Sequence, residues 1–127
     1  DQIGFNYRLP NLNAALGLAQ MESLPKILEG KRLIAQKYQA LSEANGLHFI
    51  QEPQNTKSNY WLNTVITRDL SQRDAMLEQT NNNGIMTRPA WTPMHKLLMY
   101  HNCVKAEMPN TEWLSQRIIN VPSSVVL

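Results

Sequence analysis

The chain has 127 residues, about the length of one domain with a single hydrophobic core. Its 12 lysines and arginines and 10 aspartates and glutamates give a formal net charge of +2, and the basic residues are spread along the chain. A nucleic-acid-binding surface needs clustered lysine and arginine, so this charge pattern argues against that class of function.

Cysteine content and hydropathy bear on the cellular compartment. Cys103 is the only cysteine, which excludes an intramolecular disulfide and favours a reducing cytoplasm. No apolar run approaches the roughly 20 residues of a membrane-spanning helix, and the opening residues, DQIGFN, lack the features of a signal peptide. Because the sequence does not begin with methionine, we expect it to be a piece of a longer protein.

Two helices are predicted at the start of the chain. Apolar residues recur at helical spacing from Leu12 to Met21 and fill two faces, which predicts a segment buried in a core or at an interface. Pro25 fits the first turn of a second helix, whose apolar stripe runs from Ile27 to Leu41 and ends at Asn45-Gly46. The opposite face of the second helix is predicted to be solvated and carries Lys26, Glu29, Lys31, Arg32 and Lys37.

Short strands are predicted to follow these helices. Leu47 to Ile50 and Tyr60 to Ile66 are rich in aromatic and β-branched residues, and the polar segment from Pro53 to Ser58 connects them. A third strand is predicted from Ile85 to Arg88, where Pro89 stops it.

Helical segments and irregular connections make up the rest of the predicted structure. Ser71 and Asp74 have capping-box spacing before a helix that ends in the left-handed conformation at Asn81-Asn82-Asn83-Gly84. Beyond Pro89 we expect an irregular passage, a short helical turn at 94–100, a helix at 111–119 and an extended tail. The predicted fold class is α/β (α+β), with two N-terminal helices leading into a few-stranded sheet packed with helices.

A candidate anion site lies at the start of the chain. Asn6 and Arg8 stand just before the first predicted helix, where unpaired backbone N–H groups and the helix dipole favour phosphate. The alternative is an ordinary turn with a solvated arginine. Composition alone favours the ordinary turn, because a single arginine near a helix start is common.

Two further groups of residues give little indication of a metal site or a catalytic nucleophile. His95, His101 and Cys103 have an H-x5-H-x-C spacing that matches none of the usual zinc arrangements, so separate roles are expected and no metal is predicted. A nucleophilic pair of cysteine and histidine lacks any recognisable oxyanion-hole signature around Cys103.

The passage from Arg88 to Lys96 is a candidate ligand-binding loop. It places Arg88, Trp91 and His95 close together in a passage that contains Pro89 and Pro93, and these two prolines make the loop rigid. Contact with a ligand and a packed tryptophan with solvated neighbours are equally compatible with this composition.

Long stretches of the chain resemble one enzyme family. GFNYRLPNLNAALGLAQ closely resembles a block of the DegT/StrS-type nucleotide-sugar aminotransferases, which are pyridoxal-phosphate enzymes of fold type I. GIMTRPAWTPMHKLLMY is similar to the loop after the last substantial strand of the family's small domain, and RIINVPSSVVL is similar to its usual ending. The details most resemble the subgroup that acts in nonulosonic-acid pathways such as legionaminic acid biosynthesis.

The resemblance implies that only part of such an enzyme is present. In the family, the lysine that links covalently to pyridoxal 5'-phosphate lies upstream of the GxNYR block, and no lysine here occupies a matching motif. Residues 1–24 then correspond to the end of the large domain with its interface helix, and residues 25–127 to the connecting helix and small C-terminal domain. We expect the chain alone to bind no pyridoxal phosphate covalently and to transfer no amino group.

The resemblance also implies roles for the candidate residues. Family members are homodimers, and the asparagine of the GxNYR turn, here Asn6, reaches the cofactor phosphate of the other subunit; Arg8 is a candidate for the same anionic environment. Arg88, Trp91 and His95 would lie at the edge of the substrate cleft, where they would contact a nucleotide sugar. Most members move nitrogen from glutamate to a keto-sugar nucleotide.

Two alternatives remain open. Some relatives have lost the lysine and dehydrate the sugar, and the chain could be part of such an enzyme. It could also be a non-catalytic domain that only dimerises or associates with a complete homologue.

Overall fold

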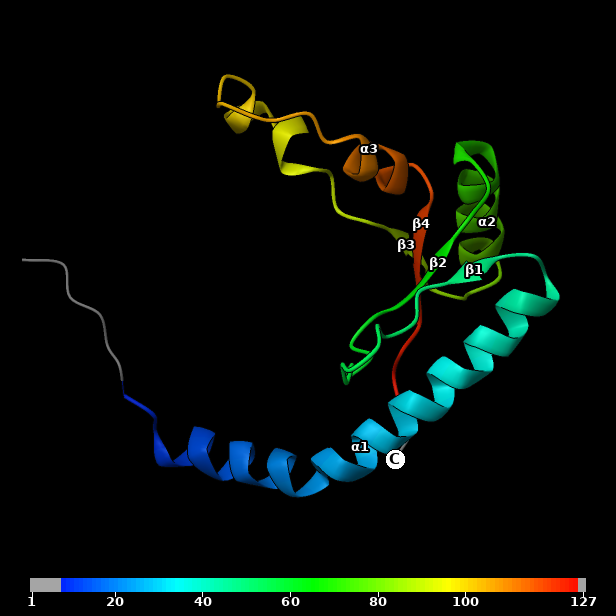
Figure 1. Ribbon diagram of the computed structural model, residues 1–127. Coiled ribbons are helices and arrows are strands. Elements are labelled where there is room, and N and C mark those ends of the chain that lie inside the picture. Colours follow the sequence, from blue (N-terminus) through cyan, green and yellow to red (C-terminus); the bar gives the residue numbers. More distant parts are fainter. Residues whose placement is uncertain (1–7, 126–127) are drawn as a thin grey trace, which may run out of the picture.

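A computed structural model of the chain describes residues 8–125. A four-stranded antiparallel sheet carries a long helix and two shorter ones, and this architecture confirms the predicted fold class (Figure 1). The elements in chain order are α1 (Asn11–Ala44), β1 (His48–Phe49), β2 (Asn63–Ile66), α2 (Leu70–Asn82), β3 (Arg88–Pro89), η1 (Met94–Lys96), η2 (Leu98–Tyr100), α3 (Pro109–Ser115) and β4 (Ile118–Val121).

The two helices predicted before residue 45 are one helix, so the break expected at Pro25 is wrong. α1 continues for 34 residues with Pro25 inside it. Proline removes one backbone hydrogen bond and crowds the preceding turn, which bends a helix without necessarily ending it. Figure 1 shows α1 bent between its two halves.

Both long helices end as their sequences predict, in a left-handed glycine. Gly46 has φ 65° and Gly84 has φ 76°, a region that a residue with a side chain rarely adopts. After α1, Leu47 N–H donates to the Ser42 carbonyl at 2.9 Å, and after α2, Ile85 N–H donates to the Thr80 carbonyl at 2.9 Å. These bonds satisfy carbonyls that the helix itself leaves without partners.

The start of α2 differs from the prediction by two residues. Asp69, and not Ser71, caps the helix, and its carboxylate accepts from the Gln72 N–H at 2.8 Å. The Gln72 side chain in turn accepts from the Arg68 N–H at 2.8 Å. Asp69 has extended backbone angles that aim its carboxylate at the first turn, whereas Ser71 already lies inside the helix.

The sheet has the strand order β1-β2-β4-β3, with every neighbouring pair antiparallel. β4 is a central strand, although residues 111–119 were predicted to be helical; α3 ends at Ser115. The β-branched Ile118, Ile119 and Val121 favour a strand. Both β2 and β3 offer β4 backbone partners, so long-range pairing overrides the helical pattern that continues from α3.

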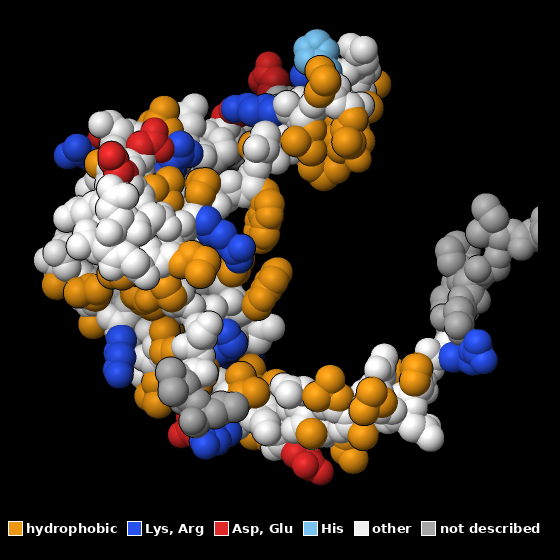
Figure 2. Space-filling view, turned by 180° about the vertical axis from the view of Figure 1, so that it is seen from behind, with side chains coloured by type: hydrophobic (Ala, Val, Ile, Leu, Met, Phe, Trp, Pro, Cys, Tyr) orange, Lys and Arg blue, Asp and Glu red, His pale blue; other side chains and the backbone are white. Residues whose placement is uncertain are grey.

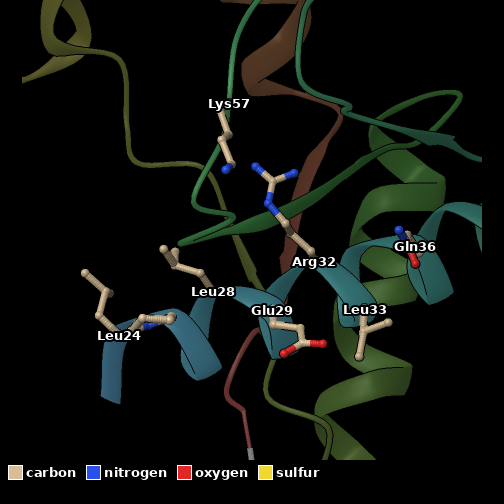
Figure 3. A pocket seen from close by; sticks show the side chains of 8 residues that line it. Leu24, Leu28, Glu29, Arg32, Leu33, Gln36 and Lys57 are labelled. Atoms are coloured by element: carbon tan, nitrogen blue, oxygen red, sulfur yellow. The ribbon is translucent and has the colours of Figure 1, made fainter. Parts of the chain in front are cut away.

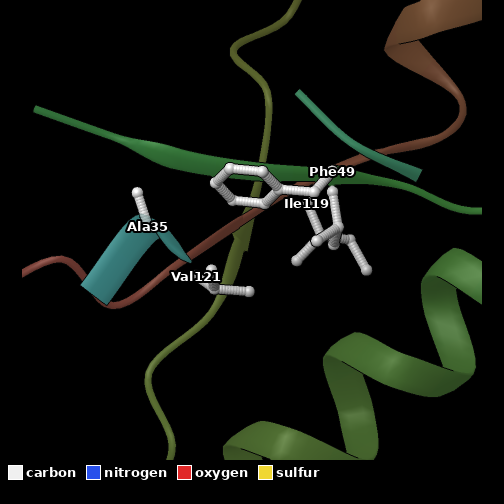
Figure 4. Close-up of a cluster of buried hydrophobic side chains, with 5 residues drawn as sticks. Ala35, Phe49, Ile119 and Val121 are labelled. Carbon is white, nitrogen blue, oxygen red and sulfur yellow. The ribbon is translucent and has the colours of Figure 1, made fainter. Parts of the chain in front are cut away.

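The hydrophobic core lies between the helices and one face of the sheet. Ile119 is fully buried in β4 and packs with Ala35 of α1, Phe49 of β1 and Val65 of β2 (Figure 4). Met76 and Leu77 of α2 pack against the same cluster. α1 and α2 therefore cover one face of the sheet.

Two basic residues of α1 that were predicted to be solvated instead hold other segments. Arg32 donates to both carboxylate oxygens of Glu52, at 3.1 and 3.2 Å, and to the Ser58 carbonyl at 2.7 Å, which fastens the 53–58 connection to α1. Lys31 donates to the Ser123 carbonyl at 2.9 Å. The C-terminal tail passes so close that a Cβ atom on Gly30 would lie 2.5 Å from a methyl group of Val125.

Two segments project from this body and give the molecule the crescent outline of Figure 2. One is the amino-terminal half of α1, where residues 11–22 are all exposed, so the burial predicted for Leu12 to Met21 is not provided by residues 8–125. The other is the segment 90–108, which contains η1 and η2. Within the described residues, no helix is both long and apolar enough to span a bilayer.

Candidate functional site

A row of polar residues crosses the sheet on the face that the helices leave uncovered. Thr64 of β2 and Arg88 of β3 both lie opposite Asn120 of β4, and directly paired residues project from the same face. The Thr64 hydroxyl donates to Asn120 Oδ1 at 2.8 Å. Asn120 is only 6% exposed, so this bond fixes a nearly buried amide beside the guanidinium of Arg88.

A hollow of about 240 Å³ opens at this row. Arg88 and Asn120 form part of its wall, together with Ser123 and Ser124 of the tail. The Ser123 hydroxyl donates to the Trp61 carbonyl at 2.6 Å, which holds the tail beside the β2 entrance. The hollow therefore has polar groups from a strand and from the bonded tail in its wall, and the apolar Leu62 and Met86 complete the lining.

Arg88 differs in its bonding from four other arginines of the chain. Arg32, Arg68, Arg73 and Arg117 each donate to a carboxylate or a carbonyl. Arg88 instead lies over the Trp91 ring at 5.6 Å, and within residues 8–125 no acceptor takes its N–H groups. Two of the predicted site residues, Arg88 and Trp91, thus lie together in a cation–π pair.

His95, the third residue predicted for the substrate cleft, belongs to a different cluster. Its Nε2 lies 2.5 Å from Glu112 Oε1, and Lys96 donates to the other oxygen of the same carboxylate. Hydrogen bonds from Lys96 and then from His95 hold the pKa of Glu112 below its ordinary value. The pair ties η1 to α3, and His95 lines hollows formed by residues 94–112, apart from the hollow at Arg88.

Of the predicted cofactor residues, Asn6 lies outside the described residues and Arg8 lies inside them. Arg8 is exposed and lies two residues before Pro10, the N-cap residue of α1. The first turn of α1 contains no acidic residue, and no side chain within residues 8–125 caps it. This end of α1 therefore has the electrostatic character that suits an anion.

His101 and Cys103 lie beyond the 88–96 loop, and Cys103 lines one of the same hollows as His95. His101 lies 3.2 Å from the Asn102 side-chain oxygen, and Cys103 is an exposed free thiol. Across residues 8–125, no three histidine, cysteine, aspartate or glutamate side chains are placed to hold a metal ion.

Comparison with known proteins decides the family. The DegT/DnrJ/EryC1/StrS aminotransferase family matches residues 1–127, the whole of the chain. This protein belongs to that family. The family member GDP-perosamine synthase from Vibrio cholerae is 36% identical over 126 residues, which cover 97% of this chain and 34% of that enzyme.

Solved aminotransferase structures show the same fold. The DesI structure determined with its TDP-sugar product is 25% identical, with a TM-score of 0.80 over 94% of this chain and 32% of that chain. Helicobacter pylori PseC, an aminotransferase of pseudoaminic acid biosynthesis, has a TM-score of 0.83 at 21% identity, over 96% of this chain and 34% of that chain. The 127-residue chain thus spans about a third of the length of the relatives it matches.

A larger hollow, of about 650 Å³, lies at the bend of α1 and includes none of the predicted site residues. Leu24, Leu28 and Leu33 contribute apolar surface, and Arg32 points toward the segment that carries Lys57 (Figure 3). Because the Arg32 guanidinium is already paired with Glu52, its charge serves the fold at this place.

Asn120 and Thr64 are the residues that sequence reasoning missed at the site. The signal was an asparagine inside the β-branched run Ile118-Ile119-Asn120-Val121, which marks a polar position in a strand. Because a helix was predicted to residue 119, the prediction placed Asn120 in no strand and gave it no partner across the sheet.

Proposed function

We propose that this chain supplies the C-terminal part of a pyridoxal-phosphate-dependent aminotransferase that moves an amino group from glutamate to a keto-sugar nucleotide. The supporting observation is the family match over all 127 residues, together with the 36% identity to GDP-perosamine synthase. A role in cell-surface polysaccharide or nonulosonic-acid biosynthesis, such as the legionaminic acid pathway, is part of the same proposal and rests on the resemblance of its loops.

The amino end of α1 fits an anionic cofactor group. Pyridoxal 5'-phosphate, when bound, supplies the electron sink for chemistry at the substrate carbon. Arg8 and the uncapped first turn of α1 would contribute positive charge toward the phosphate, and Asn6 a neutral amide donor. These residues hold one end of the group; the covalent attachment needs a lysine that has no matching motif in this chain.

The substrate side of the proposal rests on the 88–96 loop. Trp91 is 66% exposed, so its ring offers an apolar face for stacking on a sugar or base, while Arg88 supplies positive charge beside it. His95 would contact substrate through Nδ1, since Glu112 engages Nε2. Its pairing with Glu112 also positions the loop that carries Trp91.

We also propose that the complete enzyme is a homodimer whose interface covers the amino-terminal half of α1. Leu12, Leu16 and Leu18 are each more than 60% exposed, although apolar side chains of this size normally find cover. If Asn6 donates to the cofactor phosphate across that interface, Asn6→Ala should weaken cofactor binding by roughly ten- to a hundredfold, because one hydrogen bond to a charged group is lost.

Mixed dimers test the cross-subunit role. One mixed dimer pairs a wild-type subunit with a subunit that carries Asn6→Ala and also lacks the cofactor lysine, and the control pairs wild type with the lysine variant alone. The only site with a lysine then faces the altered turn. Lower cofactor affinity than in the control is expected, and equal affinity would contradict the role given to Asn6.

The activity is tested on the protein encoded by the reading frame extended upstream of Asp1. With a keto-sugar nucleotide and ¹⁵N-labelled glutamate, we expect an amino sugar that carries the label. A dehydrated sugar without label would instead support the dehydratase relatives, and neither product, with binding to a complete homologue, would support a non-catalytic domain. The 127-residue chain is the control, and we expect it to form no borohydride-stable pyridoxyl adduct.

A further inference from the structure

We propose that the hollow formed by Arg88, Asn120 and the tail residues Ser123 and Ser124 is a subsite for one small oxyanion, a carboxylate or a single phosphate group. The first observation is the state of Arg88. Its guanidinium is held over Trp91, yet its N–H groups have no acceptor within residues 8–125, unlike those of Arg32, Arg68, Arg73 and Arg117. A guanidinium fixed by stacking and lacking an acceptor is prepared for a forked contact with an anion.

The second observation is the orientation of the Asn120 amide. Its Oδ1 accepts from the Thr64 hydroxyl, so the remaining polar group is the Nδ2 donor. Asn120 lines the same hollow as Arg88 and is nearly buried. The row across β2, β4 and β3 thus presents two kinds of donor, one charged and one neutral, from rigid strand positions.

The walls of the hollow favour negative charge. The residues around it include no carboxylate, and Lys31 places an ammonium group 3.4 Å from Ser123 Oγ at the tail. Ser124 adds an exposed hydroxyl. An anion that enters therefore meets donors, and no carboxylate in the lining of the hollow competes for Arg88.

The size of the hollow limits the ligand. At about 240 Å³ it lies below the range of roughly 300–1,000 Å³ typical of sites that enclose whole drug-sized ligands. One carboxylate or phosphate group fits, and the rest of the molecule would extend toward the exposed ring of Trp91. The proposed function supplies two sources, the carboxylate of the amino donor and a phosphate of the sugar nucleotide; naming them rests on that function, whereas the oxyanion site rests on the geometry.

The test uses the 127-residue chain labelled with ¹⁵N, with NMR signals of the Arg88 side chain and the Asn120 side-chain amide as readouts. L-glutamate, inorganic phosphate and a nucleoside diphosphate are titrated separately. We expect saturable shifts of both signals with at least one of them. Saturation by glutamate alone assigns the amino donor, and saturation by phosphate and the diphosphate assigns the nucleotide.

Substitutions separate the subsite from general attraction to a basic surface. Arg88→Gln should weaken the saturating anion roughly ten- to a hundredfold, through the loss of a charge-assisted contact, and Arg88→Lys should weaken it less because it keeps the charge without the fork. Lys26→Gln, which removes an exposed charge on α1, is the matched control and should leave the affinity unchanged.

The outcomes are distinct from those of the activity test. Absence of saturable shifts with all three anions, or equal weakening by Lys26→Gln and Arg88→Gln, would overturn the subsite. Saturable binding at Arg88 and Asn120 with no amino transfer by the extended protein would overturn the proposed function and leave the subsite standing.

Discussion

The two halves of α1 have the same backbone conformation and opposite environments. In the carboxyl-terminal half, Ala35 is buried against the sheet and Arg32 fastens the 53–58 connection. In the amino-terminal half, residues 11–22 are exposed, although they include large apolar side chains. Apolar content therefore does not show which elements of a chain pack together; residues 8–125 cover one half of α1 and leave the other exposed.

The difference also indicates what keeps the exposed half helical. Helix propensity alone gives a short isolated helix only marginal stability, and in proteins most helical stability comes from packing. The amino-terminal half is continuous with a packed helix, so it needs no nucleation of its own, and Ala14, Ala15 and Leu16 favour propagation. Comparing substitutions in the two regions tests this account.

The largest effect is expected at the centre of the packed region. Ile119 is fully buried between α1, β1 and β2, so Ile119→Ala should lower the free energy of unfolding by about 2–5 kcal/mol through lost burial and a cavity. Leu16→Ala on the exposed half is the control and should change it by no more than about 0.5 kcal/mol. Urea unfolding at low protein concentration measures both; a comparable loss at Leu16 would mean that the amino-terminal half is packed in solution.

A second comparison uses one substitution on the two halves of the same helix. Ala35→Leu inserts volume against Phe49 and Val65 and should cost about 1–3 kcal/mol of stability. Ala15→Leu occurs at an exposed position, and because leucine and alanine have similar helix propensities it should be nearly neutral. Thermal unfolding followed by circular dichroism distinguishes them, and equal melting temperatures for the two variants would contradict the packing assigned to Ala35.

A third substitution should strengthen the packed region. Asn63 is fully buried in β2, and within residues 8–125 neither its side-chain nitrogen nor its oxygen has a hydrogen-bond partner. A buried polar group without partners costs about 1–3 kcal/mol, so Asn63→Leu, of similar shape, should raise stability by an amount in that range. Asn63→Asp, which places a charge there, should lower it. Destabilisation by Asn63→Leu would show that the amide has a partner in solution.

Local chemistry explains which features could be predicted from the sequence. The helix ends at Gly46 and Gly84 depend on a few adjacent residues, and the prediction was right at both. β4 depends on pairing with β2 and β3, which lie far away in the sequence, so its first two residues were assigned to a helix. The same error hid Asn120, whereas the proximity of Arg88 and Trp91 could be predicted because they share one loop.

The smallest effect concerns the other projecting segment, residues 90–108, which is fastened to α3 by the cluster of His95, Lys96 and Glu112. Hydrogen bonds from Lys96 and then from His95 lower the pKa of Glu112 from its ordinary value of 4.5. A carboxylate whose pKa is lower in the folded than in the unfolded state stabilises the fold above the unfolded value, and this contribution is lost as the pH falls through the folded value. The anchor should therefore be complete at neutral pH and weaken only below pH 4.5. Since solvent reaches the pair, the effect on stability should be small.

A ¹³C NMR titration of the Glu112 carboxyl should give a midpoint below 4.5, and Lys96→Gln should raise that midpoint more than His95→Gln because the Lys96 bond contributes most. An unchanged midpoint in Lys96→Gln would show that the 90–108 segment, like the amino-terminal half of α1, is not held by contacts within this chain.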